Sequence, residues 1–130
     1  MSSTHKVLYD PAGHAEGQLP LDRDAHRNLI QAVLAWTATP KLAAADLQQI
    51  ALQLTGAARE VAGDVRRAAG RLPADHPALA LADVVLAEAD RRLSVAPQAT
   101  VRCAQNRARL VRALYERLDR LTDVALATSP

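Results

Sequence analysis

The sequence predicts an all-α protein: an antiparallel four-helix bundle with two long helices, two shorter helices and a flexible N-terminal tail. The strongest observation is the stretch 47–72, where apolar residues recur at alternating intervals of four and three. They form a narrow seam along one side of a helix. Two later stretches repeat this interval, and short segments with proline separate the stretches. Four helices with short connections favour antiparallel neighbours.

The composition fits one domain and excludes several classes of site. A chain of 130 residues is long enough for a single core, so we expect a tail over residues 1–20 and one bundle domain over residues 21–130. There is no Phe, one Trp and two Tyr, which argues against an aromatic platform for bases or sugars. A single cysteine cannot form a disulfide framework or a multi-cysteine metal site.

Charge and hydropathy narrow the expected partners. The net charge is +2 and the signs alternate along the chain, unlike the one-sided basic field of nucleic-acid-binding proteins. No run approaches the ~20 apolar residues of a membrane span, and the N-terminus lacks an apolar signal core. We therefore expect a cytoplasmic protein with no nucleic acid, membrane, metal or cofactor among its ligands.

The tail and the first helix come first along the chain. Residues 1–20 are rich in Ser, His, Gly and Pro, with one short apolar piece at residues 7–9. They are either a disordered tail with a weak anchor or a segment that orders against a partner. The first helix begins at Asp22, a good cap, and ends at Thr39-Pro40, because the residue before proline avoids the helical conformation.

The second and third helices are separated by a proline-containing turn. The second helix begins near Pro40 or at Asp46 and runs to residue 72, where Pro73 stops it. The third begins after the cap candidate Asp75, with Pro77 near its first position, and its seam continues to residue 93.

The fourth helix spans about residues 98–127 and makes the helices unequal in length. At 1.5 Å per residue the second and fourth helices are ~40 Å long and the other two are ~25 Å. The short pair cannot cover the seams of the long pair, and a soluble protein normally gives such surface to another chain. The mismatch predicts self-association or a larger partner.

Arg107 breaks the apolar pattern, because it falls on the core side of the fourth helix. A buried, unpaired guanidinium costs several kcal/mol. Three interpretations are open. The side chain reaches water near the end of the helix, it pairs with Asp83 or Asp90, or it forms a fork for an anionic group of a ligand or partner.

Three glycines lie seven residues apart on the face opposite the seam of the second helix: Gly56, Gly63 and Gly70. Arg59 and Arg66 flank them. Glycine inside a helix costs about 1 kcal/mol relative to Ala. The strip is either sequence drift on a solvated face or a groove where a partner's helix or loop docks.

Four further features have a structural and a functional interpretation. His26, on the apolar face of the first helix, is a hydrogen-bonded core residue or a base or ligand. Trp36 is a packing anchor or an interface hot spot. Asp83 and Asp90 form the solvated edge of a seam or a carboxylate pair. Cys103 is predicted to be a small core residue.

Three segments of the second half carry a pattern made mostly of Ala, Leu and Arg on helices. They are Leu72-Pro73-Ala74-Asp75-His76-Pro77, Ala87-Glu88-Ala89-Asp90-Arg91-Arg92-Leu93 and Ala108-Arg109-Leu110-Val111-Arg112-Ala113-Leu114. Together they resemble a family of small actinobacterial helical proteins associated with natural-product biosynthesis, and the resemblance covers roughly residues 43–121. It implies a small partner of a larger enzyme, including in aziridine-forming pathways of the azinomycin type, and supplies no catalytic motif.

These observations favour a non-catalytic accessory subunit that binds and stabilises a larger biosynthetic enzyme. The alternative is a small helical enzyme or ligand-binding protein with a pocket between helices, lined by Arg107 with His26 or a carboxylate. The chain contains no phosphate-binding glycine loop, nucleophile elbow or dinucleotide fingerprint, so we do not expect catalysis by the chain alone. Long, lengthwise helices also disfavour a helix-turn-helix regulator.

Overall fold

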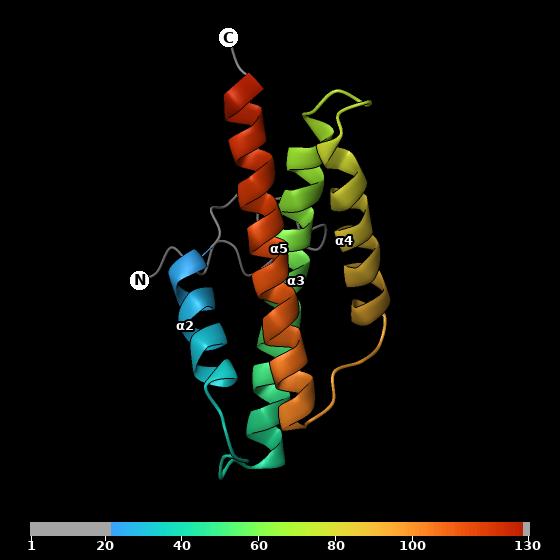
Figure 1. Ribbon diagram of the computed structural model, residues 1–130. Helices are drawn as coiled ribbons and strands as arrows, with labels where there is room; N and C mark the ends of the chain where they lie inside the picture. The colour runs from blue at the N-terminus through green and yellow to red at the C-terminus, as the bar shows by residue number, and fades with distance from the viewer. Residues whose placement is uncertain (1–21, 129–130) are drawn as a thin grey trace, which may run out of the picture.

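The computed structural model describes residues 22–128, which form four α-helices and no strand (Figure 1). The all-α bundle predicted from the sequence is confirmed. The predicted tail over residues 1–20 lies outside the described residues. The helices are α2 (Arg23–Leu34), α3 (Ala44–Gly70), α4 (Ala78–Leu93) and α5 (Val101–Thr128).

The two long helices form the centre of the molecule. Helices α3 and α5 lie side by side and point in the same direction, and the two short helices flank them on opposite sides (Figure 1). Helix α2 packs mainly on α5, whereas α4 packs on both α3 and α5. Helices that follow one another in the chain run antiparallel, as predicted.

Helix α2 begins as predicted and ends earlier. The Asp22 carboxylate accepts a hydrogen bond from the Ala25 amide at 3.3 Å. The helix ends at Leu34, well before Thr39-Pro40. Helix α5 binds this end of the helix, because Gln105 Nε2 donates to the carbonyl of Val33 in the last turn and to that of Trp36 just beyond it, at 3.2 Å each.

The other helix starts also differ in detail from the prediction. Helix α3 begins at Ala44, between the two predicted starts, and Asp46 lies in its first turn near the positive end of the dipole. The N-cap position of α4 is Pro77, and His76 just before it, instead of Asp75, binds the first amide, because its Nδ1 accepts from the Ala78 amide at 3.1 Å. At the start of α5, the Thr100 hydroxyl accepts a hydrogen bond from the Cys103 amide at 3.0 Å.

The seams of the long helices cover each other, which corrects the inference drawn from helix length. The lengths are indeed unequal, with 27 and 28 residues in α3 and α5 against 12 and 16 in α2 and α4. Alanines on the facing sides let the two long backbones approach closely. The α3 seam is therefore at most 9% exposed at every position. These positions are Leu47, Ala51, Leu54, Ala58, Val61, Val65, Ala68 and Leu72.

Exposed apolar surface occurs instead on α4. Leu81 is 48% exposed and Val84 is 63% exposed, and the alanines at positions 80 and 87 beside them are exposed as well. The opposite face of α4 contains Ala82 and Ala89, which are fully buried. The solvent face of a surface helix is normally polar, so a strip of four exposed apolar residues is unusual there, with the exposed Asp83 at its border. We call Ala80, Leu81, Val84 and Ala87 the α4 outer stripe.

Candidate functional site

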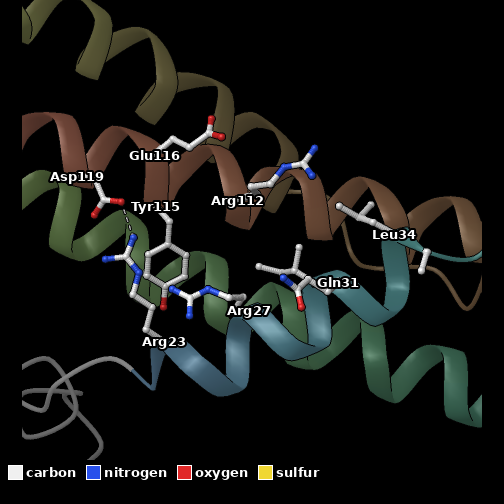
Figure 2. A pocket seen from close by; sticks show the side chains of 10 residues that line it. Arg23, Arg27, Gln31, Leu34, Arg112, Tyr115, Glu116 and Asp119 are labelled. Atoms are coloured by element: carbon white, nitrogen blue, oxygen red, sulfur yellow. Dashed lines mark hydrogen bonds and ion pairs between the residues drawn. The ribbon is translucent and has the colours of Figure 1, made fainter.

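A groove of about 550 Å³ lies between α2 and α5 (Figure 2). Charged side chains of both signs stand around an apolar floor, and one tyrosine lies at its inner end. The lining residues are Arg23, Arg27, Ile30, Gln31, Leu34, Ala35, Arg112, Tyr115, Glu116 and Asp119.

Arg23 of α2 closes one end of this groove against α5. Its Nη2 lies 2.6 Å from Asp119 Oδ2, and its guanidinium carbon lies 4.5 Å from the centre of the Tyr115 ring (Figure 2). The hydrogen bond with Asp119 raises the pKa of Arg23 above its ordinary value. Arg23 therefore has both an anionic and an aromatic partner within its own chain.

His26 connects α2 to both long helices. Its Nδ1 lies 2.5 Å from the Tyr115 hydroxyl oxygen, and its Nε2 lies 3.7 Å from Glu60 Oε1 of α3. Burial lowers the pKa of His26, against an opposing effect of Asp22, and burial raises the pKa of Tyr115 to about 12. Both side chains are thus held neutral near pH 7. The geometry agrees with the interpretation of His26 as a hydrogen-bonded packing residue.

Arg107 is buried, and its contacts disagree with two of its three interpretations, the one that reaches water and the one that pairs with a carboxylate of α4. The residue is 6% exposed, so it does not reach water at the end of the helix. It does not pair with Asp83 or Asp90, and Asp90 binds Arg66 instead. Arg107 Nη2 donates to the carbonyl of Val95 at 2.7 Å, and Nη1 is buried with no hydrogen-bond partner among the residues that the structure describes.

A pocket of about 290 Å³ adjoins Arg107, between the start of α5 and the connection from α4. Three arginines line it together with neutral polar and apolar groups, and no carboxylate does. The lining residues are Arg92, Val95, Ala96, Gln98, Thr100, Arg102, Cys103, Asn106, Arg107 and Leu110. The chemistry of this pocket suits an anion.

Cys103 belongs to this pocket and not to the core. It is partly exposed, and its Sγ accepts a hydrogen bond from the Gln98 amide at 3.3 Å. The prediction of a core cysteine is therefore wrong, because the connection before α5 leaves a hollow beside it. Trp36 is partly buried and packs against the core, as expected of a packing anchor.

The glycine strip on α3 is open. An added Cβ would meet nothing within 4 Å at Gly56 and Gly70, and only the side chain of Arg67 at Gly63. The arginines beside the strip hold α4 in place. Arg66 Nη2 lies 2.7 Å from the Asp90 carboxylate, and Arg59 Nη2 donates to the Leu93 carbonyl at 3.4 Å. The docking groove flanked by these two arginines stays a prediction.

Sequence reasoning missed Arg92 and Arg102 as members of the Arg107 pocket. The signal was available, because residues 91–115 contain no Asp or Glu. The same residues include six arginines, Arg91, Arg92, Arg102, Arg107, Arg109 and Arg112. A chain with a net charge of +2 thus concentrates positive charge around the start of one helix.

Comparisons with protein-family models, with curated proteins and with solved structures gave no match. Within residues 22–128 there is no cluster of His, Cys, Asp and Glu that could hold a metal ion. None of the four helices of the described range combines the length and hydropathy needed to cross a membrane. The geometry of the described residues is therefore the basis of the functional argument.

Proposed function

We propose that the chain is a non-catalytic accessory protein that binds a larger protein through the α4 outer stripe. The resemblance of its second half to a family of small actinobacterial proteins suggests the partner, an enzyme of natural-product or antibiotic biosynthesis. The observation that carries the proposal is the exposure of Leu81 and Val84 beside the exposed alanines 80 and 87, with the exposed Asp83 at the border of that face.

Energetics supports an interface at this face. Complete burial of a Leu or Val side chain is worth about 1.5–3 kcal/mol, and roughly half of each is still available here. The stripe is two turns long and ends at Glu88 and Arg91, which form an ion pair. An amphipathic helix of the partner, laid along α4, would bury the stripe and leave these charges at the rim. Binding to the folded enzyme would stabilise it by mass action.

The test is co-expression of the chain with each enzyme encoded beside its gene, followed by affinity purification of the tagged enzyme. We expect one neighbour to retain the chain, with a solution mass equal to the sum of the two proteins. Val84→Glu should abolish retention, since it buries a charge in an apolar contact. Leu126→Glu is the matched control, because Leu126 is 70% exposed near the end of α5 and away from the stripe.

Circular dichroism of both variants would establish that they fold. Retention that survives Val84→Glu would contradict the assignment of the stripe. Separate elution of every neighbour, with enzyme solubility unchanged by the chain, would contradict the accessory role. A dimeric mass for the chain alone that Val84→Glu reduces to a monomer would assign the stripe to self-association instead.

A further inference from the structure

The second inference concerns Arg107 and is independent of the α4 outer stripe. Arg107 is 6% exposed, and its one hydrogen bond within residues 22–128 is to the Val95 carbonyl. Among these residues, its Nη1 has no partner. A guanidinium has five N–H donors, and burying a charge without a counter-charge is costly. Folded proteins seldom contain a buried N–H group without an acceptor, unless a ligand or an ordered water supplies one.

The surroundings of Arg107 do not supply the missing negative charge. Of the other two arginines that line the pocket, Arg92 is paired with Glu88, 2.5 Å away. Arg102 is exposed and makes no ion pair within the described residues. The pocket therefore contains two arginines, Arg102 and Arg107, without a counter-charge.

The start of α5 adds to this positive field. The N-terminus of a helix carries about half a positive charge and normally has Asp or Glu in its first turn. The first turn of α5 has no acidic residue and contains Arg102. A second hollow on the same turn shares Arg102 and Asn106, adds Arg109, and is also lined without a carboxylate. An arginine at this end of a helix is unfavourable unless an anion neutralises it.

We propose that this pocket binds the phosphate group of a small phosphorylated organic molecule. A phosphate monoester carries nearly two negative charges at pH 7, which matches the two uncompensated arginines. Arg107 would donate Nη1–H to one phosphate oxygen, with the Val95 carbonyl remaining the acceptor for Nη2, and Arg102 would bind from the solvent side. The side chains of Val95, Ala96 and Leu110 line the same pocket and suit the organic part.

Entry of the ligand requires a small movement of the connection between α4 and α5. Arg107 Nη1 is shielded from bulk water, and the connection over residues 94–100 contributes the carbonyl that covers Arg107. Val95 borders the pocket and is 61% exposed, so it does not anchor this connection in the core. An arginine that is shielded from water binds an anion more strongly than an exposed one, because the effective dielectric constant around it is lower.

The test is calorimetric titration of the full chain with butyl phosphate and with inorganic phosphate at constant ionic strength, with acetate and chloride as controls. Butyl phosphate should bind more tightly than inorganic phosphate, and acetate and chloride should give no saturable signal. Arg102→Gln and Arg107→Met should each weaken binding by about tenfold or more, as expected for the loss of a charged hydrogen bond.

Arg71→Gln is the matched control, because it removes one positive charge at the exposed end of α3, at the opposite end of the bundle from Thr100. It should leave the affinity for butyl phosphate unchanged. The site is overturned if the wild-type chain binds neither phosphate, or if Arg71→Gln weakens binding as much as Arg102→Gln. Equal affinity for the two phosphates would overturn the assignment to an organic ester. Arg102→Gln tests the proposal even if Arg107→Met fails to fold, since Arg102 is exposed.

Discussion

Two regions of helix α5 are equally buried and differ in the hydrogen-bond and charge partners of their polar side chains. Tyr115 and Arg107 are each 6% exposed, and they are eight residues apart, about 12 Å along the helix axis. Around Tyr115, helix α2 supplies His26 to the hydroxyl and Arg23 to the ring, and Arg23 in turn has Asp119. Around Arg107, the described part of the chain supplies one acceptor, the Val95 carbonyl.

The difference separates a region that stabilises the fold from a region that is poised to bind. In the region around Tyr115, the cation Arg23 is paired with an anion of the same chain, Asp119. Removing one partner there lowers the stability of the fold and creates no ligand site. Where the cation lacks an anion, the folded protein bears an electrostatic cost that a ligand can relieve. The burial of a charged residue is thus less informative than the presence of its counter-charge. The predictions below test this distinction, from the largest expected effect to the smallest.

The largest effect is expected at Tyr115. Tyr115→Ala should lower the free energy of unfolding by about 3 kcal/mol, because it removes an aromatic ring that packs in the core and beneath Arg23. Tyr115→Phe retains the ring and loses only the hydrogen bond with His26, so it should cost about 1 kcal/mol. Urea unfolding measures both values. A Tyr115→Ala variant no less stable than Tyr115→Phe would mean that the ring contributes little.

One substitution applied to both regions should have opposite effects. Arg107→Met should leave the free energy of unfolding unchanged or raise it by about 1 kcal/mol, because it replaces a buried, incompletely paired charge by an apolar side chain of similar length. Arg23→Met should lower it by less than about 1 kcal/mol, since its ion pair with Asp119 is partly exposed.

Both variants can be compared with the wild-type chain in urea at one salt concentration. Destabilisation by Arg107→Met of about 2 kcal/mol or more would mean that the chain itself supplies the counter-charge of Arg107. The contrast between the two regions would then disappear.

The existence and direction of the helices followed from the sequence because periodic apolar residues and prolines act locally. The pairing of α3 with α5 did not follow, because it depends on which seams meet. The two seams bury each other, so unequal helix lengths leave little of them uncovered. The exposed apolar surface lies on α4, where Leu81 and Val84 lie on the face opposite the buried Ala82 and Ala89.

The functional residues were predictable only one at a time. The position of Arg107 on the core side of its helix was readable from spacing alone, and so was the position of His26 on an apolar face. The partners of these residues were not, because they come from segments distant in the sequence. Tyr115 is 89 residues away from His26, and the Val95 carbonyl lies in a connection without periodicity. Asp90 was a candidate partner for Arg107, yet α4 turns it toward Arg66.

A carboxylate introduced near Arg107 should give this region the counter-charge that the region around Tyr115 already has. Thr100 caps α5 with its hydroxyl. Thr100→Asp should raise the free energy of unfolding by about 0.5 kcal/mol, since Asp caps better than Thr and suits the positive end of the helix. It should also abolish butyl phosphate binding, because the new charge neutralises the pocket. Thr100→Ser, which keeps a neutral cap, should change neither property. Undiminished phosphate affinity in Thr100→Asp would contradict the electrostatic basis of the site.

The smallest effect concerns the pH dependence of the paired region. Burial lowers the pKa of His26 below its ordinary value of 6.5, so the folded state disfavours the protonated imidazole. The contribution of His26 to stability is therefore fully present above about pH 6.5. It declines as the pH falls through that value, because the unfolded chain then binds the proton more readily. Urea unfolding from about pH 8 to about pH 5.5 should show this decline in the wild-type chain.

His26→Gln provides the reference for this measurement, since glutamine does not titrate and can still accept a hydrogen bond from the Tyr115 hydroxyl. The wild-type chain should lose more stability than His26→Gln over the same pH interval. A relative gain of stability on acidification would instead mean that Glu60, 3.7 Å from His26 Nε2, outweighs burial and draws the proton into the folded state. The paired region would then contain a protonated histidine held by a carboxylate, and its contrast with the unpaired Arg107 would become sharper still.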